Sequence, residues 1–282
     1  MIRKLAAAAL VAISLHALAP VGAQAANVLV VLSDENHLDL KDGKTFKTGF
    51  YLNELMQPVK MLLDAGHEVI FATPHGKAPA VDASSVDPVY FGGDADAMAE
   101  HQKLLDRLGV TSLSKSPVIS LKRVEQIGYD HFDAIYIPGG HAPMQDLLVS
   151  KDLARLLTDF HEKGKATALV CHGPIALMST LDKAEEFARQ LEEGKATRPA
   201  SWIYADYKFT VISNEEEEQA KPLLKGGEMK FYPQTALEQA GGRFSSNDKP
   251  WTAHMVTDRE VITGQNPASA RQVGEELLKR LK

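Results

Sequence analysis

One cysteine stands in a context that is typical of a nucleophile. Cys171, the single cysteine of the chain, directly follows the apolar run Ala166–Val170 and precedes His172-Gly173-Pro174 and the run IALMSTL. A strand, a sharp turn and a helix in this order predict a nucleophile elbow, whose strained turn lifts the side chain off the sheet. Unpaired amides at the start of the helix would stabilise a thiolate, so we expect a lowered pKa for Cys171. The alternative is an inert core cysteine at the end of a strand.

Two backbone amides and an imidazole could act with this thiol. His172 is the natural acid or base because imidazole titrates near neutral pH, although a surface histidine is the alternative. Gly140 lies in the turn Pro138-Gly139-Gly140-His141, which ends another apolar run. Its amide and the amide of the residue after the nucleophile could together stabilise an oxyanion, unless the two glycines only form an ordinary turn.

A carboxyl group is a further candidate. Glu54 lies between Leu52 and Leu55 in a segment with apolar residues at helical spacing. A carboxyl buried there would be desolvated, could stay protonated and could donate a hydrogen bond to the thiolate. Spacing alone also permits a glutamate on the exposed face of a helix.

These residues need a scaffold, and the rest of the chain predicts one. Apolar runs typical of buried strands alternate with helical patterns. The predicted strands are Asn27–Leu32, His67–Ala72, Ala134–Ile137, Ala166–Val170 and Thr210–Ile212, with a hairpin at His254–Val256 and Val261–Ile262. The predicted helices are Tyr51–Leu63, Leu153–Phe160 and Ser269–Leu281. This alternation indicates an α/β fold with a mostly parallel sheet covered by helices, and a site at the carboxyl ends of its strands.

Two polar helical segments, Asp94–Leu108 and Lys183–Tyr207, fit the alternation poorly. We interpret them as insertions in a single domain spanning residues 26–282, forming a small helical cap near the site. Glu215–Glu218 is a run of four acids, which by default is the solvated start of a helix.

Composition excludes several classes of protein. The chain has 282 residues, a net charge of -6 and no long basic run, so we expect no nucleic-acid partner. With only one cysteine, an internal disulfide framework or a multi-cysteine metal site is excluded.

The first 25 residues predict an export signal. Arg3 and Lys4 precede the apolar segment Leu5–Ala19, and Ala23-Gln24-Ala25 gives the small residues that signal peptidase requires. The apolar segment is short for a membrane span, with a retained anchor helix as the alternative. We therefore expect cleavage near Ala25 and a periplasmic or secreted protein with no membrane partner after cleavage.

Several motifs together resemble the ThiJ/PfpI superfamily, in particular its branch of heat-shock chaperones and glutathione-independent glyoxalases (glyoxalase III). The motifs are TGFYLNEL (48–55), TPHGKAPAVDASSVDP (73–88), YDHFDAIYIPGGHAPM (129–144), VCHGPIAL (170–177), SNEEE (213–217) and TGQNPASA (263–270). The resemblance implies a flavodoxin-like fold related to class I glutamine amidotransferases, and a homodimer.

The resemblance also implies roles for individual residues. Cys171 matches the family nucleophile, His172 its partner and Glu54 a buried acid at the thiol. The amides of Gly140 and His172 match the oxyanion donors, and Glu217 matches the third member of the triad, with Glu216 close behind.

The activity implied is conversion of small 2-oxoaldehydes such as methylglyoxal into 2-hydroxy acids, through a cysteine hemithioacetal and without a cofactor or metal. The alternatives are a stress-response holdase chaperone, which would not use Cys171, and a cysteine peptidase or amidase with the same triad.

Overall fold

A central sheet of seven strands organises the chain. The computed structural model describes residues 25–282, so the predicted signal segment lies outside the described residues except for Ala25. The sheet has the order β10-β11-β7-β6-β1-β4-β5. Its strands are β1 (Asn27–Val31), β4 (Glu68–Thr73), β5 (Ile119–Ser120), β6 (Ala134–Ile137), β7 (Ala166–Val170), β10 (Met255–Asp258) and β11 (Val261–Gly264).

Strand pairing confirms the predicted α/β class. In this sheet β1, β4, β5, β6, β7 and β11 pair in parallel, and only β10 runs antiparallel, as the first strand of the predicted hairpin with β11. Apart from Asn27 and Thr167, the residues of β1, β6 and β7 are apolar, and all except Asn27 are buried. Parallel strands covered on both faces require such continuous apolar runs.

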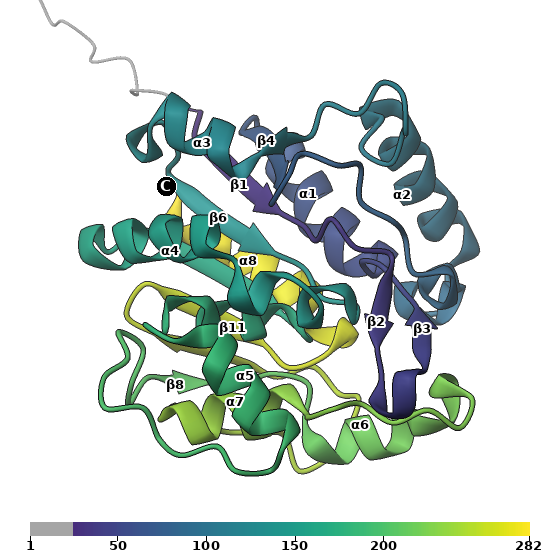
Figure 1. Ribbon diagram of the computed structural model, residues 1–282. Coiled ribbons are helices and arrows are strands. Elements are labelled where there is room, and N and C mark those ends of the chain that lie inside the picture. The colour runs from purple at the N-terminus through teal and green to yellow at the C-terminus, as the bar shows by residue number, and fades with distance from the viewer. Residues whose placement is uncertain (1–24) are drawn as a thin grey trace, which may run out of the picture.

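Helices cover both faces of this sheet (Figure 1). The helices are α1 (Leu52–Asp64), α2 (Ala95–Leu108), α3 (Leu121–Ile127), α4 (Lys151–Lys163), α5 (Ala184–Glu192), α6 (Asn214–Ala220), α7 (Pro233–Ala240) and α8 (Ala270–Arg280). α1 packs against α8 on one face, and α3 packs against α4 on the other (Figure 1). None of the helices in residues 25–282 combines the length and apolar character needed to cross a bilayer.

Two small sheets flank the main one. β2 (His37–Asp39) and β3 (Thr45–Lys47) form an antiparallel hairpin that precedes α1, which the sequence analysis did not predict. β8 (Lys208–Phe209) pairs in parallel with β9 (Arg243–Phe244) outside the main sheet.

The predicted strand Thr210–Ile212 is wrong. β8 ends at Phe209, and the next residues make isolated hydrogen bonds in place of a ladder. The amide of Thr210 donates to the side chain of Thr263 (2.9 Å), and the amide of Ile212 donates to the carbonyl of Cys171 (3.0 Å). Since Cys171 already turns away from the sheet, no regular pairing can continue there.

The two polar segments differ in structure. The helix predicted at 94–108 is present as α2, which packs on α1. The helix predicted at 183–207 extends only from Ala184 to Glu192. It stops because Gly194 takes a left-handed conformation (φ 65°) and the following residues form turns and irregular backbone.

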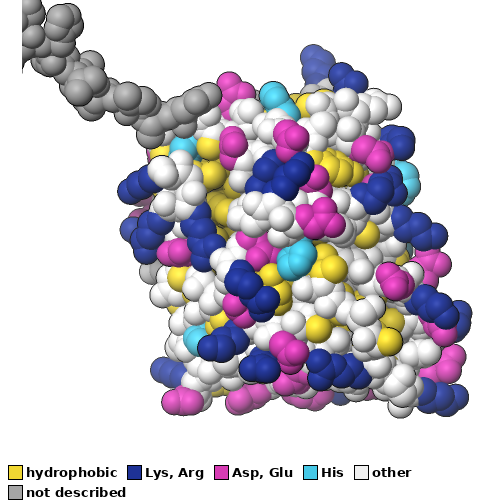
Figure 2. Space-filling view, turned by 90° about the vertical axis from the view of Figure 1, so that its left-hand side faces the viewer, with side chains coloured by type: hydrophobic (Ala, Val, Ile, Leu, Met, Phe, Trp, Pro, Cys, Tyr) yellow, Lys and Arg dark blue, Asp and Glu magenta, His cyan; other side chains and the backbone are white. Residues whose placement is uncertain are grey.

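Charged side chains of both signs are interspersed on the face shown in Figure 2. Basic groups therefore form no single-sign patch on this face. This agrees with the near balance of 31 basic and 37 acidic residues, which gives a net charge of -6.

Candidate active site

The backbone of Cys171 has the strained conformation of a nucleophile elbow. Its φ is 59°, which is uncommon for a residue other than glycine. The residue follows β7 directly, and its amide still donates to the carbonyl of Gly264 on the neighbouring strand (2.9 Å). The 3-10 helix Gly173–Thr180 begins two residues later. A Cβ on Gly173 would lie only 2.5 Å from the carbonyl oxygen of Ile137, so the turn requires glycine there.

The turn brings His172 back onto the sulfur that precedes it. Nδ1 of His172 lies 3.4 Å from Sγ of Cys171, and Nε2 lies 2.7 Å from Oε1 of Glu217. All three side chains are buried. The arrangement is a nucleophile, a base within reach of it and an acid that orients the base.

Glu217 and Glu216 occupy different environments although they are neighbours. Oε1 of Glu216 accepts from the amide of Trp251 (2.7 Å) and from Nδ2 of Asn266 (2.8 Å). Its Oε2 accepts from the amide of Ser213 (3.0 Å) and from Nε2 of Gln265 (3.0 Å). Glu216 therefore holds the loops behind the site together, whereas Glu217 contacts His172.

The solvated interpretation of Glu215–Glu218 is therefore wrong for its two central residues. α6 does begin here, with Ser213 and Glu216 forming a reciprocal capping box. Its first turn faces inward, so that Glu216 is fully buried and Glu217 is 3% exposed.

Glu54 lies at the reactive thiol. Its Oε2 accepts a hydrogen bond from the amide of Gly139 (2.7 Å), and its side chain contacts the thiol of Cys171. A Cβ on Gly139 would lie 2.6 Å from Cβ of Cys171 and 2.7 Å from Oε2 of Glu54, so glycine lets the thiol and the acid approach each other. Burial raises the pKa of Glu54 from 4.5 to about 8, which keeps the carboxyl protonated at neutral pH. The helix-surface interpretation of Glu54 is wrong, since the residue is fully buried.

The expectation of a lowered pKa for Cys171 is contradicted. Burial raises the pKa of the thiol well above its usual value, and the neighbouring carboxyls Glu54 and Glu217 raise it further. The Gly140 amide donates to the sulfur and lowers the pKa only in part. Desolvation and nearby acids outweigh the following helix, which is a short 3-10 helix. The resting nucleophile is therefore a thiol, and its proton must leave when it attacks.

Burial also determines the state of the triad partners. It lowers the pKa of His172 to about 3, so the imidazole is neutral and can accept a proton. It raises the pKa of Glu217 to about 7, an effect that the neighbouring His141 partly offsets. A neutral base thus faces a protonated nucleophile.

The two backbone amides proposed as oxyanion donors belong to the turns around Cys171. Gly140 has a φ of 85°, and a Cβ there would lie 2.0 Å from the carbonyl oxygen of Gly49, so only glycine fits this turn. Its amide points at the sulfur, and the amide of His172 lies beside Gly139. Both could stabilise negative charge on an oxygen bound to the attacked carbon.

His141 is a site residue that sequence reasoning missed. Its ring is stacked on that of His172 with centroids 4.1 Å apart, and its Nε2 lies 3.8 Å from Oε2 of Glu217. The only sequence signal is its place directly after Gly140. The side chains of His141, His172 and Glu217 are close enough to hold a metal ion together.

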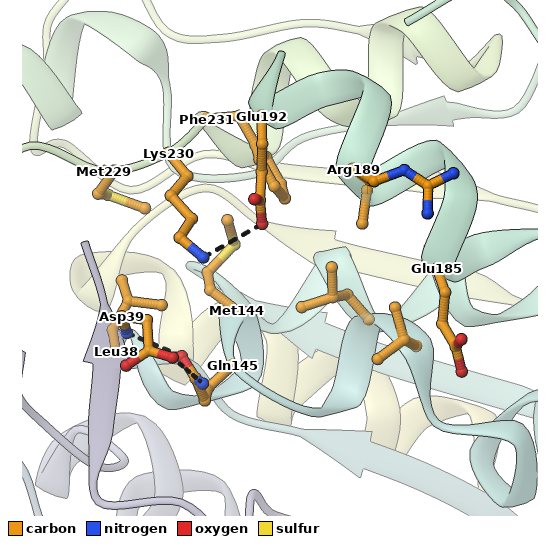
Figure 3. A pocket seen from close by; sticks show the side chains of 13 residues that line it. Leu38, Asp39, Met144, Gln145, Glu185, Arg189, Glu192, Met229, Lys230 and Phe231 are labelled. Atoms are coloured by element: carbon orange, nitrogen blue, oxygen red, sulfur yellow. Dashed lines mark hydrogen bonds and ion pairs between the residues drawn. The ribbon is translucent and has the colours of Figure 1, made fainter. Parts of the chain in front are cut away.

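A pocket of about 230 Å³ lies apart from the thiol, between β2, α5 and the segment 229–231 (Figure 3). On one side Asp39 and Gln145 bond each other, and on the other Lys230 faces Glu192 at 3.4 Å (Figure 3). None of the residues that surround Cys171 in the elbow lines this pocket. This pocket is therefore separate from the reactive thiol.

The chain is similar to known proteins over most of its length. A family model described as ThiJ/PfpI family-like matches residues 46–219. Glyoxalase 3 of Candida albicans is 27% identical over 251 residues, which cover 89% of this chain and 96% of that protein. Glutathione-independent glyoxalase HSP31 of Saccharomyces cerevisiae is 25% identical over 259 residues, covering 90% and 98% of the two chains. The crystal structure of glyoxalase III from Candida albicans matches the fold with a TM-score of 0.67 at 22% identity, covering 91% of this chain and 98% of that one.

Proposed function

This chain belongs to the ThiJ/PfpI family, and from that premise we propose that it is a glutathione-independent glyoxalase of the glyoxalase III type. Its substrates are small 2-oxoaldehydes such as methylglyoxal, and its products are 2-hydroxy acids. The observation that carries the proposal is the fully buried carboxyl of Glu54, which accepts from the Gly139 amide (2.7 Å) next to the side chain of Cys171. A simple hydrolytic triad does not need this second acid, whereas moving a proton between two adjacent carbons does.

The first step forms a hemithioacetal. Sγ of Cys171 attacks the aldehyde carbon while Nδ1 of His172, 3.4 Å away, takes the thiol proton. The developing oxyanion accepts from the amides of Gly140 and His172 and is then protonated by the Glu54 carboxyl, which becomes a carboxylate. The thiol that other glyoxalases take from glutathione is thus supplied by the protein.

The second step moves hydrogen between carbons. The hydrogen on the former aldehyde carbon leaves as a proton to the Glu54 carboxylate, the electron pair moves toward the adjacent carbonyl, and the oxygen of that carbonyl takes the proton held by His172 to give an enediol. Glu54 returns its proton to the adjacent carbon, which becomes the hydroxyl-bearing carbon of a thioester. The hydroxyl on the sulfur-bearing carbon gives its proton to His172 as the thioester carbonyl forms. Water then cleaves the thioester, releasing the 2-hydroxy acid and the thiol. One carbon is oxidised and its neighbour is reduced, so no external oxidant or reductant is needed.

Burial of the nucleophile supports a small substrate. Cys171 is 3% exposed, and Glu54 is fully buried beside it. An aldehyde of three carbons can reach such a thiol more readily than a peptide bond in a chain. This favours the glyoxalase over the peptidase or amidase alternative. A holdase would act through surface groups, independently of this thiol.

Product formation tests the proposal. Wild-type protein incubated with methylglyoxal, without glutathione, should produce lactate, and Cys171→Ala should produce none. Ser179→Ala is the matched control, because it also removes one buried γ atom and its hydroxyl has no hydrogen-bond partner in residues 25–282. Ser179→Ala should keep wild-type activity. Absence of acid formation from a panel of 2-oxoaldehydes would contradict the proposal. Cleavage of peptide amides by the wild type but not by Cys171→Ala would favour the peptidase or amidase, and holdase activity that survives in Cys171→Ala would favour the chaperone.

Export to the periplasm or the medium and assembly as a homodimer complete the proposal. The pattern of residues 3–25 supports export, and the family resemblance supports the dimer. Amino-terminal sequencing of protein produced in a bacterial host should begin near Ala26, and sedimentation should give twice the monomer mass.

A further inference from the structure

The proposed mechanism uses His172 and Glu217 but gives no task to the second imidazole at the site. His141 is 4% exposed, and its Nε2 faces Oε2 of Glu217 at 3.8 Å. The other oxygen of the same carboxylate lies 2.7 Å from Nε2 of His172. One carboxylate is therefore placed between two buried imidazoles, with one ligand-type atom from each residue within 4.8 Å of the others.

We propose that His141, His172 and Glu217 form a binding site for a zinc-class divalent cation, and that the bound cation switches the triad off. The inhibitory consequence rests on the proposed glyoxalase function, whereas the binding itself does not. The cation is thus a regulator of the site and not a participant in the reaction.

The donor set selects the class of cation. Two imidazole nitrogens and a carboxylate oxygen suit zinc, cobalt, nickel or copper, whereas magnesium and calcium prefer oxygen ligands alone. Tetrahedral zinc with bonds of about 2.0–2.2 Å needs neighbouring donor atoms roughly 3.3 Å apart. Oε1 of Glu217 lies 2.7 Å from Nε2 of His172, Oε2 of Glu217 lies 3.8 Å from Nε2 of His141, and one donor atom from each residue lies within 4.8 Å of the others. Binding would draw the three donor atoms closer together.

The backbone fixes His141 in this position. Its amide donates to Oγ1 of Thr48 (3.3 Å), whose hydroxyl in turn donates to the buried carboxylate of Asp82 (2.7 Å). The ring of Phe46, on β3, packs edge-on against the His141 ring at 5.2 Å. His141 is therefore held beside Glu217 by contacts that do not involve the triad.

A cation on Nε2 would disable the base. Nδ1 of His172 faces the sulfur of Cys171, so in the active form Nδ1 must carry a lone pair and Nε2 the hydrogen. Coordination through Nε2 displaces that hydrogen and leaves the ring's proton on Nδ1, where it can only be donated. Glu217 would at the same time lose its contact with His172. The sulfur lies on the opposite edge of the ring and is not among the ligands.

The position of the sulfur gives a sharp test, because zinc usually inhibits cysteine enzymes by capturing the thiolate. Equilibrium dialysis of Cys171→Ala against zinc chloride should still give one zinc per chain. Adding His141→Phe, which keeps a ring stacked on His172 but removes a ligand, should weaken binding at least about 10-fold. Cys171→Ala with His75→Ala is the matched control. It removes an exposed histidine, 2.7 Å from Asp34, that could bind zinc at the surface, and it should leave the stoichiometry unchanged.

Two results would overturn the site, and neither depends on catalysis. Loss of zinc in Cys171→Ala would identify the thiol as the ligand, and unchanged affinity in the His141→Phe double variant would exclude His141. His141→Asn repeats the test if the phenylalanine variant has a changed circular dichroism spectrum. In active wild-type protein, zinc should inhibit lactate formation and a chelator should restore it, while magnesium should have no effect. A protein that binds zinc as described but forms no acid would refute the glyoxalase proposal and leave the metal site standing.

Discussion

Nε2 of His172 and Oε1 of Glu217 lie 2.7 Å apart although the two residues are separated by 45 positions in the sequence. The connecting chain includes α5 and the irregular segment before β8, yet it returns the first turn of α6 to the elbow. This contact turns a buried imidazole so that its other nitrogen faces the sulfur of Cys171. The orientation of the proposed base therefore depends on one glutamate.

Replacing that glutamate should reduce turnover without preventing folding. Glu217→Gln keeps the shape of the side chain but removes its charge, so the orientation and tautomer of His172 are no longer fixed. We expect kcat to fall partially, by less than in Glu54→Gln, with little change in the melting temperature. Steady-state kinetics with methylglyoxal and a thermal melt measure the two effects.

Glu216→Gln provides the contrasting variant. Its carboxylate accepts from the backbone of Ser213 and Trp251 and from two side chains of the TGQN motif. An amide nitrogen in place of one oxygen would face donors and leave them unpaired, at a cost of about 1–3 kcal/mol. Here the melting temperature should fall. If Glu216→Gln melts like the wild type and Glu217→Gln does not, the assignment of the two acids is reversed.

Much of the fold follows from the sequence because its strands are continuous apolar runs. Parallel strands covered on both faces, such as β1, β6 and β7, consist mainly of apolar residues because neither of their faces is exposed to water. The β2–β3 hairpin was not predicted because its strands have three residues each and include charged side chains. Thr210–Ile212 is apolar enough for a strand. However, the amide of Thr210 donates to the side chain of Thr263 and the amide of Ile212 donates to the carbonyl of Cys171, so no regular ladder forms.

The candidate site was predictable only where a local pattern encodes it. Strand, turn and glycine surround Cys171 in the sequence, and the left-handed backbone of Cys171 agrees with that pattern. The burial of Glu217 depends on how α6 packs, which an acidic run does not show. His141 has no pattern of its own and enters the site because Gly140 turns the chain toward α6. The raised pKa of Cys171 comes from its burial and from carboxyls distant in sequence, which a local pattern does not show.

Glu54→Gln should abolish turnover. The substitution keeps the size and polarity of the side chain and its acceptance from the Gly139 amide, so folding should persist. It removes the proton that the carboxyl holds beside the sulfur, and general acid–base catalysis of this kind contributes about 10²–10⁴-fold. Lactate formation should fall by at least this factor. Near-native turnover of every 2-oxoaldehyde tested, in a folded variant, would refute the mechanism.

The same glutamate should make stability depend on pH. Its pKa rises from 4.5 when exposed to about 8 when folded, so between these values only the folded state holds the proton. The free energy of unfolding contributed by the Glu54 proton has its full value below the pKa of the unfolded state. It is lost as the pH rises through the pKa of the folded state, and the total loss is up to about 5 kcal/mol. Glu54→Gln removes this titration. Urea unfolding from pH 5 to pH 9 should therefore show the wild type losing stability relative to the variant, and parallel curves would contradict the assignment.

The pH dependence of Cys171 alkylation should report how Glu54 affects the pKa of the thiol. Burial and the two neighbouring carboxyls raise its pKa, so the rate of alkylation by iodoacetamide should rise with pH with a midpoint above the value of about 8.5 for a free thiol. Glu54→Gln removes the nearer negative charge and should move the midpoint down. Glu217→Gln should move it less, because Glu217 raises the pKa less than Glu54 does.

Urea-unfolded protein supplies the control for this titration, because its single cysteine should react with the midpoint of a free thiol. A midpoint in the folded wild type at or below that of the unfolded protein would mean that the thiolate is already stabilised at rest. In that case His172 would not be needed as a base, since no proton would remain on the sulfur to be removed during attack. A high midpoint that Glu54→Gln leaves unchanged would instead attribute the shift to burial alone, and Glu54 would act on the substrate without controlling the thiol.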